Sequence, residues 1–339
     1  MSAAHSQQGP ATAGTTRRGS ETSDQGKGRQ APSPWAIPLS GWKDVALRTW
    51  RESSSDNIGL IAAGMAFYAF LALVPMLGAI VLSYGLLAEP STVIRHMQTL
   101  TTMLPRDVAG LVAEQMVNVV RTSSGKKGLG VVLALAIALF GARNAAGAII
   151  SALNIAYEEE EKRGFIKVSL LALAITATGV AVTAIALLAA GSLGFMHRLV
   201  PESPVVVAAT RILSYALLAL AAAAAAATLY RYGPSRDRAR WTWLTPGSAL
   251  FAVCWVILTL GFGFYASNFG DYGATYGSLS AVVVLLTWVY FSGYALLFGA
   301  ELNSELEHQT ARDTTAGGAQ PLGQRGAWAA DNVAPSEST

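Results

Sequence analysis

The chain has 339 residues, of which 52% are hydrophobic and only 13% are charged. Soluble domains carry roughly 25% charged residues, so this composition is typical of a membrane protein and argues against a soluble enzyme. The formal net charge of +3 is too small to indicate nucleic-acid binding. The single cysteine, Cys254, excludes an intramolecular disulfide and a cysteine-based metal cluster.

Both ends of the chain are polar. Residues 1–40 and 308–339 are rich in small and polar residues such as Gly, Ser, Thr and Gln, together with Pro. Such segments cannot bury enough apolar surface to offset chain entropy, so we expect two disordered tails. The N-terminal tail has no apolar h-region, and no signal peptide is therefore predicted. Residues 41–307 remain as a single membrane domain.

Residues 41–52 are predicted to form an amphipathic helix on the cytoplasmic surface of the membrane. Its apolar face would carry Trp42, Val45, Ala46, Thr49 and Trp50, and its polar face Lys43, Asp44, Arg48, Arg51 and Glu52. Tryptophan at the apolar edge and bases on the polar face are typical of a helix lying in the headgroup region. We therefore expect contact with anionic lipids through Lys43, Arg48 and Arg51.

Six apolar runs follow, and each exceeds the roughly 20 residues that a helix needs to cross a bilayer. They lie at residues 58–87, 128–157, 165–195, 205–230, 241–269 and 276–303. None alternates polar and apolar residues with period two, so the runs predict helices and not barrel strands. The predicted fold class is all-α: a polytopic transmembrane helix bundle of about six spans.

Lys and Arg near the ends of the runs set the predicted orientation. They gather before the first run, between the second and third, and between the fourth and fifth, which predicts that both termini are cytoplasmic. The loop between the first two runs is also basic, against this rule, but it is long enough to fold by itself. Pro105 and the apolar spacing after it predict a helical hairpin on the outer face, or alternatively a lid over a cavity.

The sequence contains no constellation for enzyme chemistry. The four histidines, His5, His96, His197 and His308, are scattered without metal-ligand spacing. No GxSxG, Walker A or GxGxxG fingerprint lies in a suitable context. We therefore predict no catalytic residue, no metal site and no cofactor.

Arg143 is the main anomaly, because it lies inside the second run. A charge at membrane depth costs about 2.5–3.5 kcal/mol on insertion scales, although a long side chain can reach the interface. Beside it, Asn144, Gly147, Ser151 and Asn154 recur at intervals of three or four residues and form one polar stripe. Such a stripe should face the inside of the bundle, where polar groups find partners and small residues allow close packing.

Depth along the helices suggests partners for Arg143. At 1.5 Å per residue, Arg143 lies about 22 Å along the second run, and Tyr290 and Tyr294 lie about 21–27 Å along the sixth. Tyr68 of the first run reaches a similar level. We expect Arg143 to contact Tyr68 or the Tyr290–Tyr294 stretch by a hydrogen bond or a cation–π interaction. Its role is either to anchor the bundle or to bind an anionic group of a substrate.

Two further features bear on transport. Pro75 removes a backbone hydrogen bond and predicts a kink in the first helix, either as shape alone or as a hinge for gating. Asn268, Asp271, Tyr272 and Tyr276 gather where the fifth and sixth runs meet the predicted outer face. They form either a solvated turn or a mouth that contacts a cation or another ligand.

Motifs along the chain support a family resemblance. They lie at residues 66–75 (AFYAFLALVP), 152–157 (ALNIAY), 229–234 (LYRYGP), 272–279 (YGATYGSL) and 299–303 (GAELN). Over roughly residues 40–307 the chain resembles the YihY/BrkB family of bacterial inner-membrane proteins, once labelled ribonuclease BN. The resemblance implies a six-span protein of the bacterial inner membrane whose molecular activity is poorly defined.

Two functions from different classes are consistent with the sequence. A transporter, channel or flippase-like protein for an anionic or lipid-linked substrate is favoured by the polar stripe beside Arg143, by Pro75 and by the outer mouth. A membrane scaffold or regulator, acting through its tails and basic loops, is the alternative. The ribonuclease label is disfavoured because the loops supply no set of acid, base or metal ligands. The lipid bilayer is the expected partner, and no nucleic acid is.

Overall fold

A computed structural model of the chain describes residues 27–87, 124–178, 204–268 and 278–335. These residues are predominantly helical, which confirms the all-α fold class. The long helices are α3 (Ile58–Leu87), α6 (Ser124–Ala156), α8 (Pro204–Tyr232), α9 (Trp241–Asn268) and α11 (Ser278–His308). The shorter ones are η1 (Pro34–Ala36), α2 (Leu39–Ser55), an apolar helix at Phe165–Thr178, and α12 (Trp328–Asp331).

Three of the long helices contain a stretch that is long and apolar enough to cross a membrane. These stretches are Val207–Tyr232 in α8, Trp241–Tyr265 in α9 and Val282–His308 in α11. A fourth arises if α2 and the Ile58–Ala72 part of α3, which meet at a bend of 61°, form one broken span. The described residues therefore contain three, or up to four, candidate membrane spans. The count of six stays a prediction.

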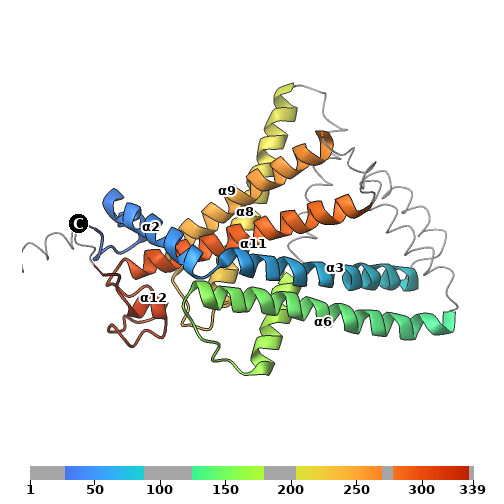
Figure 1. Cartoon of the computed structure of the whole chain (residues 1–339), viewed down its shortest axis with the longest axis horizontal. Coiled ribbons are helices and arrows are strands. Elements are labelled where there is room, and N and C mark those ends of the chain that lie inside the picture. Colours follow the sequence, from blue (N-terminus) through green and yellow to red (C-terminus); the bar gives the residue numbers. More distant parts are fainter. Residues whose placement is uncertain (1–26, 88–123, 179–203, 269–277, 336–339) are drawn as a thin grey trace, which may run out of the picture.

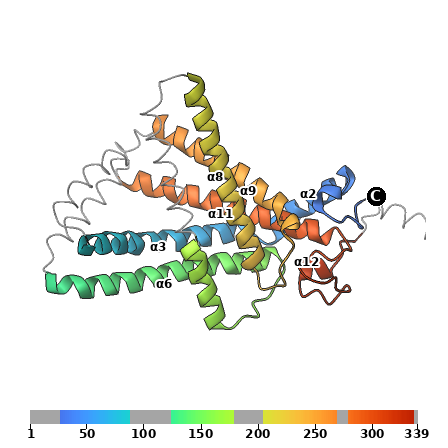
Figure 2. The same cartoon turned by 180° about the vertical axis from the view of Figure 1, so that it is seen from behind.

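The helices pack as a splayed bundle, and α3 and α6 run side by side along it (Figure 1). A Cβ atom on Gly141 of α6 would lie 3.2 Å from the Cα atom of Ala72, so small residues let the two backbones approach closely. The α11 helix packs against both α3 and α9, and α8 packs against α9 (Figure 2).

Among the glycines that the structure describes, Gly247 makes the closest contact with a neighbouring helix, where α9 meets α11. A Cβ atom on Gly247 would lie 2.0 Å from the carbonyl oxygen of Gly299, which leaves no room for any side chain. Asn303 of α11 completes the contact, because its Oδ1 accepts the Gly247 N–H at 2.8 Å and its Nδ2 donates to the Leu244 carbonyl at 3.3 Å. These bonds lie next to Pro246, which lacks an N–H of its own.

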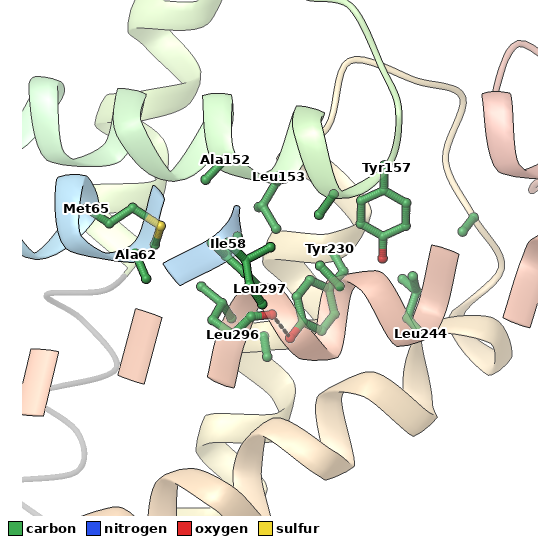
Figure 3. Close-up of a cluster of buried hydrophobic side chains, with 14 residues drawn as sticks. Ile58, Ala62, Met65, Ala152, Leu153, Tyr157, Tyr230, Leu244, Leu296 and Leu297 are labelled. Carbon is green, nitrogen blue, oxygen red and sulfur yellow. Dashed lines mark hydrogen bonds between the residues drawn. The ribbon is translucent and has the colours of Figure 1, made fainter. Parts of the chain in front are cut away.

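A buried apolar core joins the helices near one end of the bundle (Figure 3). Ile58 of α3, Leu153 of α6, Tyr230 of α8 and Leu297 of α11 are all almost fully buried there. The Tyr230 hydroxyl donates a hydrogen bond to the carbonyl oxygen of Leu296 at 2.8 Å, so the polar end of this buried ring is satisfied.

We use the term capped end for the end of the bundle where residues 27–37, α2 and residues 309–335 lie together (Figure 1). The two disordered tails stay a prediction, while the structure describes residues 27–40 and 309–335 and hydrogen bonds between them. Arg325 is 5% exposed and donates to the carbonyls of Ala311 at 2.8 Å and Ala330 at 2.6 Å. Hydrogen bonds donated by a buried guanidinium thus hold a segment whose composition supplies little apolar surface.

The predicted surface helix exists as α2, but its faces are used differently. Val45 and Thr49 are buried against the protein, and Val45 joins a cluster with Trp243 and Leu306. The Arg48 guanidinium donates to Glu305 at 2.5 Å and to Gln309 at 2.7 Å. Arg48 is therefore engaged by α11 and the following residues, and the predicted lipid contact of Lys43, Arg48 and Arg51 stays a prediction.

Candidate functional site

The Arg143 side chain lies against the helix Phe165–Thr178. Its Nε donates to the Ser169 hydroxyl at 3.1 Å, its Nη1 donates to the Asn144 amide oxygen at 3.3 Å, and its guanidinium lies 4.6 Å from the centre of the Phe165 ring. The predicted cation–π contact is thus made with Phe165 and not with Tyr68, Tyr290 or Tyr294. Within the described residues, Arg143 forms no ion pair with a carboxylate.

A cavity of about 580 Å³ opens beside Arg143, between α3, α6 and the helix Phe165–Thr178. Its polar lining comes from Tyr68 of α3, from Arg143, Asn144 and Ser151 of α6, and from Ser169. Gly64 and Gly147 widen it, since a Cβ atom added to either would meet nothing within 4 Å. The volume lies in the range of small-molecule sites, and the site combines an apolar lining with a few polar groups.

Asn154, the last residue of the predicted stripe, serves a different purpose. It is buried near the end of α6, where its Oδ1 accepts the backbone N–H of Ser235 at 2.7 Å and its Nδ2 donates to Glu161 at 3.0 Å. Asn154 therefore ties the segment after α6 to the segment after α8. It does not line the cavity.

Tyr290 and Tyr294 pack against the buried core rather than the cavity. Both approach Gly59 of α3, where a Cβ atom would lie 3.4 Å from the Tyr290 hydroxyl and 3.9 Å from the Tyr294 ring. The Tyr294 ring also stacks on Phe298 with an interplanar angle of 10°. These tyrosines reach the face of α3 that turns toward α11.

The remaining predicted features stay predictions. The α3 helix continues through position 75, and a hinge at Pro75 is a hypothesis about motion. Asn268 is the last residue of α9, and Asp271, Tyr272 and Tyr276 lie outside the described residues, as does the predicted helical hairpin after the first run.

A second cavity, of about 540 Å³, lies next to the same short helix and touches Leu171. Five basic residues line it: Lys162, Arg163, Arg231, Arg236 and Arg238. Asp237 is the one acidic residue among those that line it. In the sequence these bases indicate only the orientation of the chain in the membrane. The cavity itself could not be predicted, because it depends on how the segments before the short helix and after α8 come together.

Three of these bases pair with acids, and the first of them, Lys162, lies 3.6 Å from the Glu159 carboxylate. Arg163 donates to both carboxylate oxygens of Glu161, at 2.7 Å each, and these bonds lower the pKa of Glu161 to about 2. Arg236 pairs with Glu307 at 2.6 Å, and both side chains are almost fully buried. Glu307 also accepts a hydrogen bond from the Thr314 hydroxyl at 2.6 Å.

Two other bases of this cavity lie over aromatic rings. The guanidinium of Arg231 lies 4.7 Å from the Trp241 ring centre, and that of Arg238 lies 5.0 Å from the Tyr232 ring centre. In the part of the chain that the structure describes, neither forms an ion pair with an acid. Their positive charge therefore remains directed at the cavity.

Comparison with known proteins identifies relatives, several of which are named as membrane proteins. A protein of Bacillus subtilis named putative ribonuclease-like protein YfkH is 29% identical over 241 residues, which cover 66% of this chain and 87% of the relative. A UPF0761 membrane protein of Chlorobium phaeobacteroides is 27% identical over 254 residues, or 74% of this chain and 55% of the relative.

Shorter matches are more similar. A UPF0761 membrane protein of Xanthomonas campestris is 40% identical over 78 residues, which are 23% of this chain and 18% of the relative. No solved structure matches this chain. The family model described as Virulence factor BrkB matches residues 49–322, which include all five long helices, the cavity beside Arg143 and part of the capped end. The chain therefore belongs to the Virulence factor BrkB family of membrane proteins.

Proposed function

We propose that this protein moves an anionic or lipid-linked substrate across the bacterial inner membrane, and that the cavity beside Arg143 binds the anionic group. The observation that carries the proposal is the state of Arg143. Its partners are a hydroxyl, an amide oxygen and an aromatic ring, and all three are neutral. A positive charge beside a cavity, without an acidic partner among the described residues, favours an anionic ligand.

The second cavity supports the same class of substrate. It lies next to the same short helix as the first, and Arg231 and Arg238 contribute positive charge to it. Aromatic rings beside arginines are typical of the level of the lipid headgroups. The proposal therefore has both termini in the cytoplasm and the basic cavity collecting anions at that surface. Arg143 then holds the anion within the bundle.

The test uses proteoliposomes that contain the full chain and a fluorescently labelled anionic lipid, phosphatidylglycerol, or the zwitterionic phosphatidylcholine. Exchange between leaflets is measured by quenching the outer leaflet. In parallel, binding of phosphate monoesters and organic anions is measured by thermal shift in detergent. We expect one of these anionic probes to be moved or bound, and Arg143→Ala to weaken that response roughly tenfold or more, because a hydrogen bond to a charged group contributes about 1.5–3 kcal/mol.

Two controls keep this result specific. Arg143→Lys retains the charge and should retain part of the response. Lys167→Gln removes an exposed charge from the same short helix outside the cavity lining, and it should behave like the wild type. Full activity of Arg143→Ala on every responding anion would remove the cavity from the proposed path.

A scaffold or regulator remains the second candidate, favoured by a different observation. At the capped end the large apolar side chains of Trp35, Leu39 and Trp50 are all strongly exposed. Exposed apolar side chains in one region mark contacts with a partner protein or with the membrane surface. A phenotype abolished by Trp35→Ser with Leu39→Ser, and unaffected by Arg143→Ala, would favour this function over transport.

A further inference from the structure

Three carboxylates from separate elements meet at the capped end. Glu52 lies near the end of α2, Asp56 in the turn to α3, and Glu158 just after α6. One oxygen atom from each of the three lies within 4.8 Å of those from the other two. The sequence predicted no metal site because positions 52 and 56 are about a hundred residues away from position 158, and no spacing motif connects them.

Negative charge in this cluster is not balanced by nearby bases. In the described ranges, none of the three carboxylates forms an ion pair with a lysine or an arginine. Two bases of this region, Arg48 and His308, lie against Glu305 instead, at 2.5 Å and 3.7 Å. Partial burial raises the pKa of Glu158, and the negative charge of Asp56 raises it further.

Glu301 adds an independent observation. Glu301 belongs to α11 and is only 3% exposed. Its carboxyl group lies within hydrogen-bonding reach of Asp56. Its Oε1 atom is buried and has no hydrogen-bond partner among the described residues. A buried carboxylate oxygen without a donor is costly, so this atom needs a proton or a cation nearby.

We propose that Glu52, Asp56 and Glu158 together bind one hard divalent cation of the Mg²⁺, Ca²⁺ or Mn²⁺ class, with Glu301 contributing the fourth carboxylate of the site. Ligand sets made only of oxygen atoms select these ions over zinc or copper. Glu158 is exposed, so water can reach the cation from that side and complete its coordination.

The bound ion would link four elements of the bundle. It joins the end of α2, the turn before α3, the segment just after α6, and α11, because each contributes one carboxylate. The α3 and α6 helices also form two walls of the cavity beside Arg143. The site therefore stabilises the end of the same helix pair whose other surfaces enclose that cavity.

The test measures ion binding directly on the full chain in detergent after removal of metals with a chelator. Binding of Mn²⁺ is followed by electron paramagnetic resonance and binding of Ca²⁺ by calorimetry, each with a thermal melt. We expect about one ion per chain and a higher Tm with the ion. Asp56→Asn and Glu158→Gln should raise the Kd roughly 10- to 100-fold, the loss typical of a damaged ligand shell.

Glu160→Gln is the matched control, since it removes an exposed carboxylate two residues from Glu158 and should leave the Kd unchanged. If Asp56→Asn fails to fold, Glu158→Gln carries the test, because an exposed side chain tolerates substitution. Absence of ion binding to the wild type would overturn the proposal and mean that the carboxylates share protons only. An equal loss in Glu160→Gln would overturn it as non-specific surface binding.

Discussion

Near the capped end, Arg236 and Glu307 are both almost fully buried and pair at 2.6 Å, whereas the contacts that the structure describes for Arg143 beside the cavity are all with neutral groups. The backbones differ in the same way. Gly247 touches Gly299 so closely that no Cβ atom fits, while Gly147 in the cavity wall has open space around it. The contacts of the first region stabilise the fold, whereas the cavity beside Arg143 leaves an open, charged site that contributes less to stability.

Breaking the buried pair should give the largest loss of stability. Arg236→Met or Glu307→Gln leaves one buried partner uncompensated, and we expect a loss of about 3–5 kcal/mol in the free energy of unfolding. The measurement is denaturant or thermal unfolding in detergent. The double variant Arg236→Met with Glu307→Leu should recover much of this loss, because an apolar pair removes both charges together. A double variant as unstable as the singles would contradict this account.

Substitutions of the two glycines should have effects of intermediate size on stability. Gly247→Ala forces its Cβ atom into the Gly299 carbonyl, so we expect a loss of about 1–3 kcal/mol. Gly147→Ala meets nothing and replaces a helical glycine, so stability should stay equal or rise by about 0.5–1 kcal/mol. Thermal melts of both variants under one condition check the difference. Equal losses in the two would mean that α9 and α11 can separate without cost.

The long helices could be predicted from the sequence because an uninterrupted apolar run encodes a membrane helix without reference to its neighbours. The position of the stripe beside Arg143 followed from helical spacing, and Asn144, Gly147 and Ser151 do line the cavity. The partners of Arg143 could not be predicted, because the depth of a residue along a helix does not give the direction in which the helix faces. Tyr290 lies at a suitable depth but faces another side of α3.

The ordered structure of the capped end could not be predicted from the sequence, for a different reason. Its order depends on hydrogen bonds between distant segments, such as that from the Thr310 hydroxyl to the Ala31 carbonyl at 3.0 Å. Such bonds leave no periodic pattern in a sequence, and composition alone predicts disorder there. The same limitation hid the carboxylates of Asp56 and Glu301, which are far apart in the chain.

The smallest expected effect on stability is that of the partly exposed pair Arg163–Glu161 at the second cavity. Hydrogen bonds from Arg163 lower the pKa of Glu161 to about 2 from an ordinary value of 4.5. This carboxylate therefore contributes stability above pH 4.5 that is lost as the pH falls toward 2. Glu161→Gln should remove this part of the acid dependence and leave stability near pH 7 only slightly lower, since the pair is partly exposed. Identical melts of the two proteins across the acid range would contradict the assignment.

The contacts of Arg29 carry a consequence for topology. Its carbonyl oxygen accepts the N–H of Ala311 at 2.8 Å, and its guanidinium donates to the carbonyl of Ala334. Two segments in direct contact should lie on one side of a membrane, which predicts that the chain between residues 29 and 311 crosses it an even number of times. Three or five crossings are incompatible with this contact, while four and six satisfy it. Reporters fused at the two ends of the protein must therefore give the same answer.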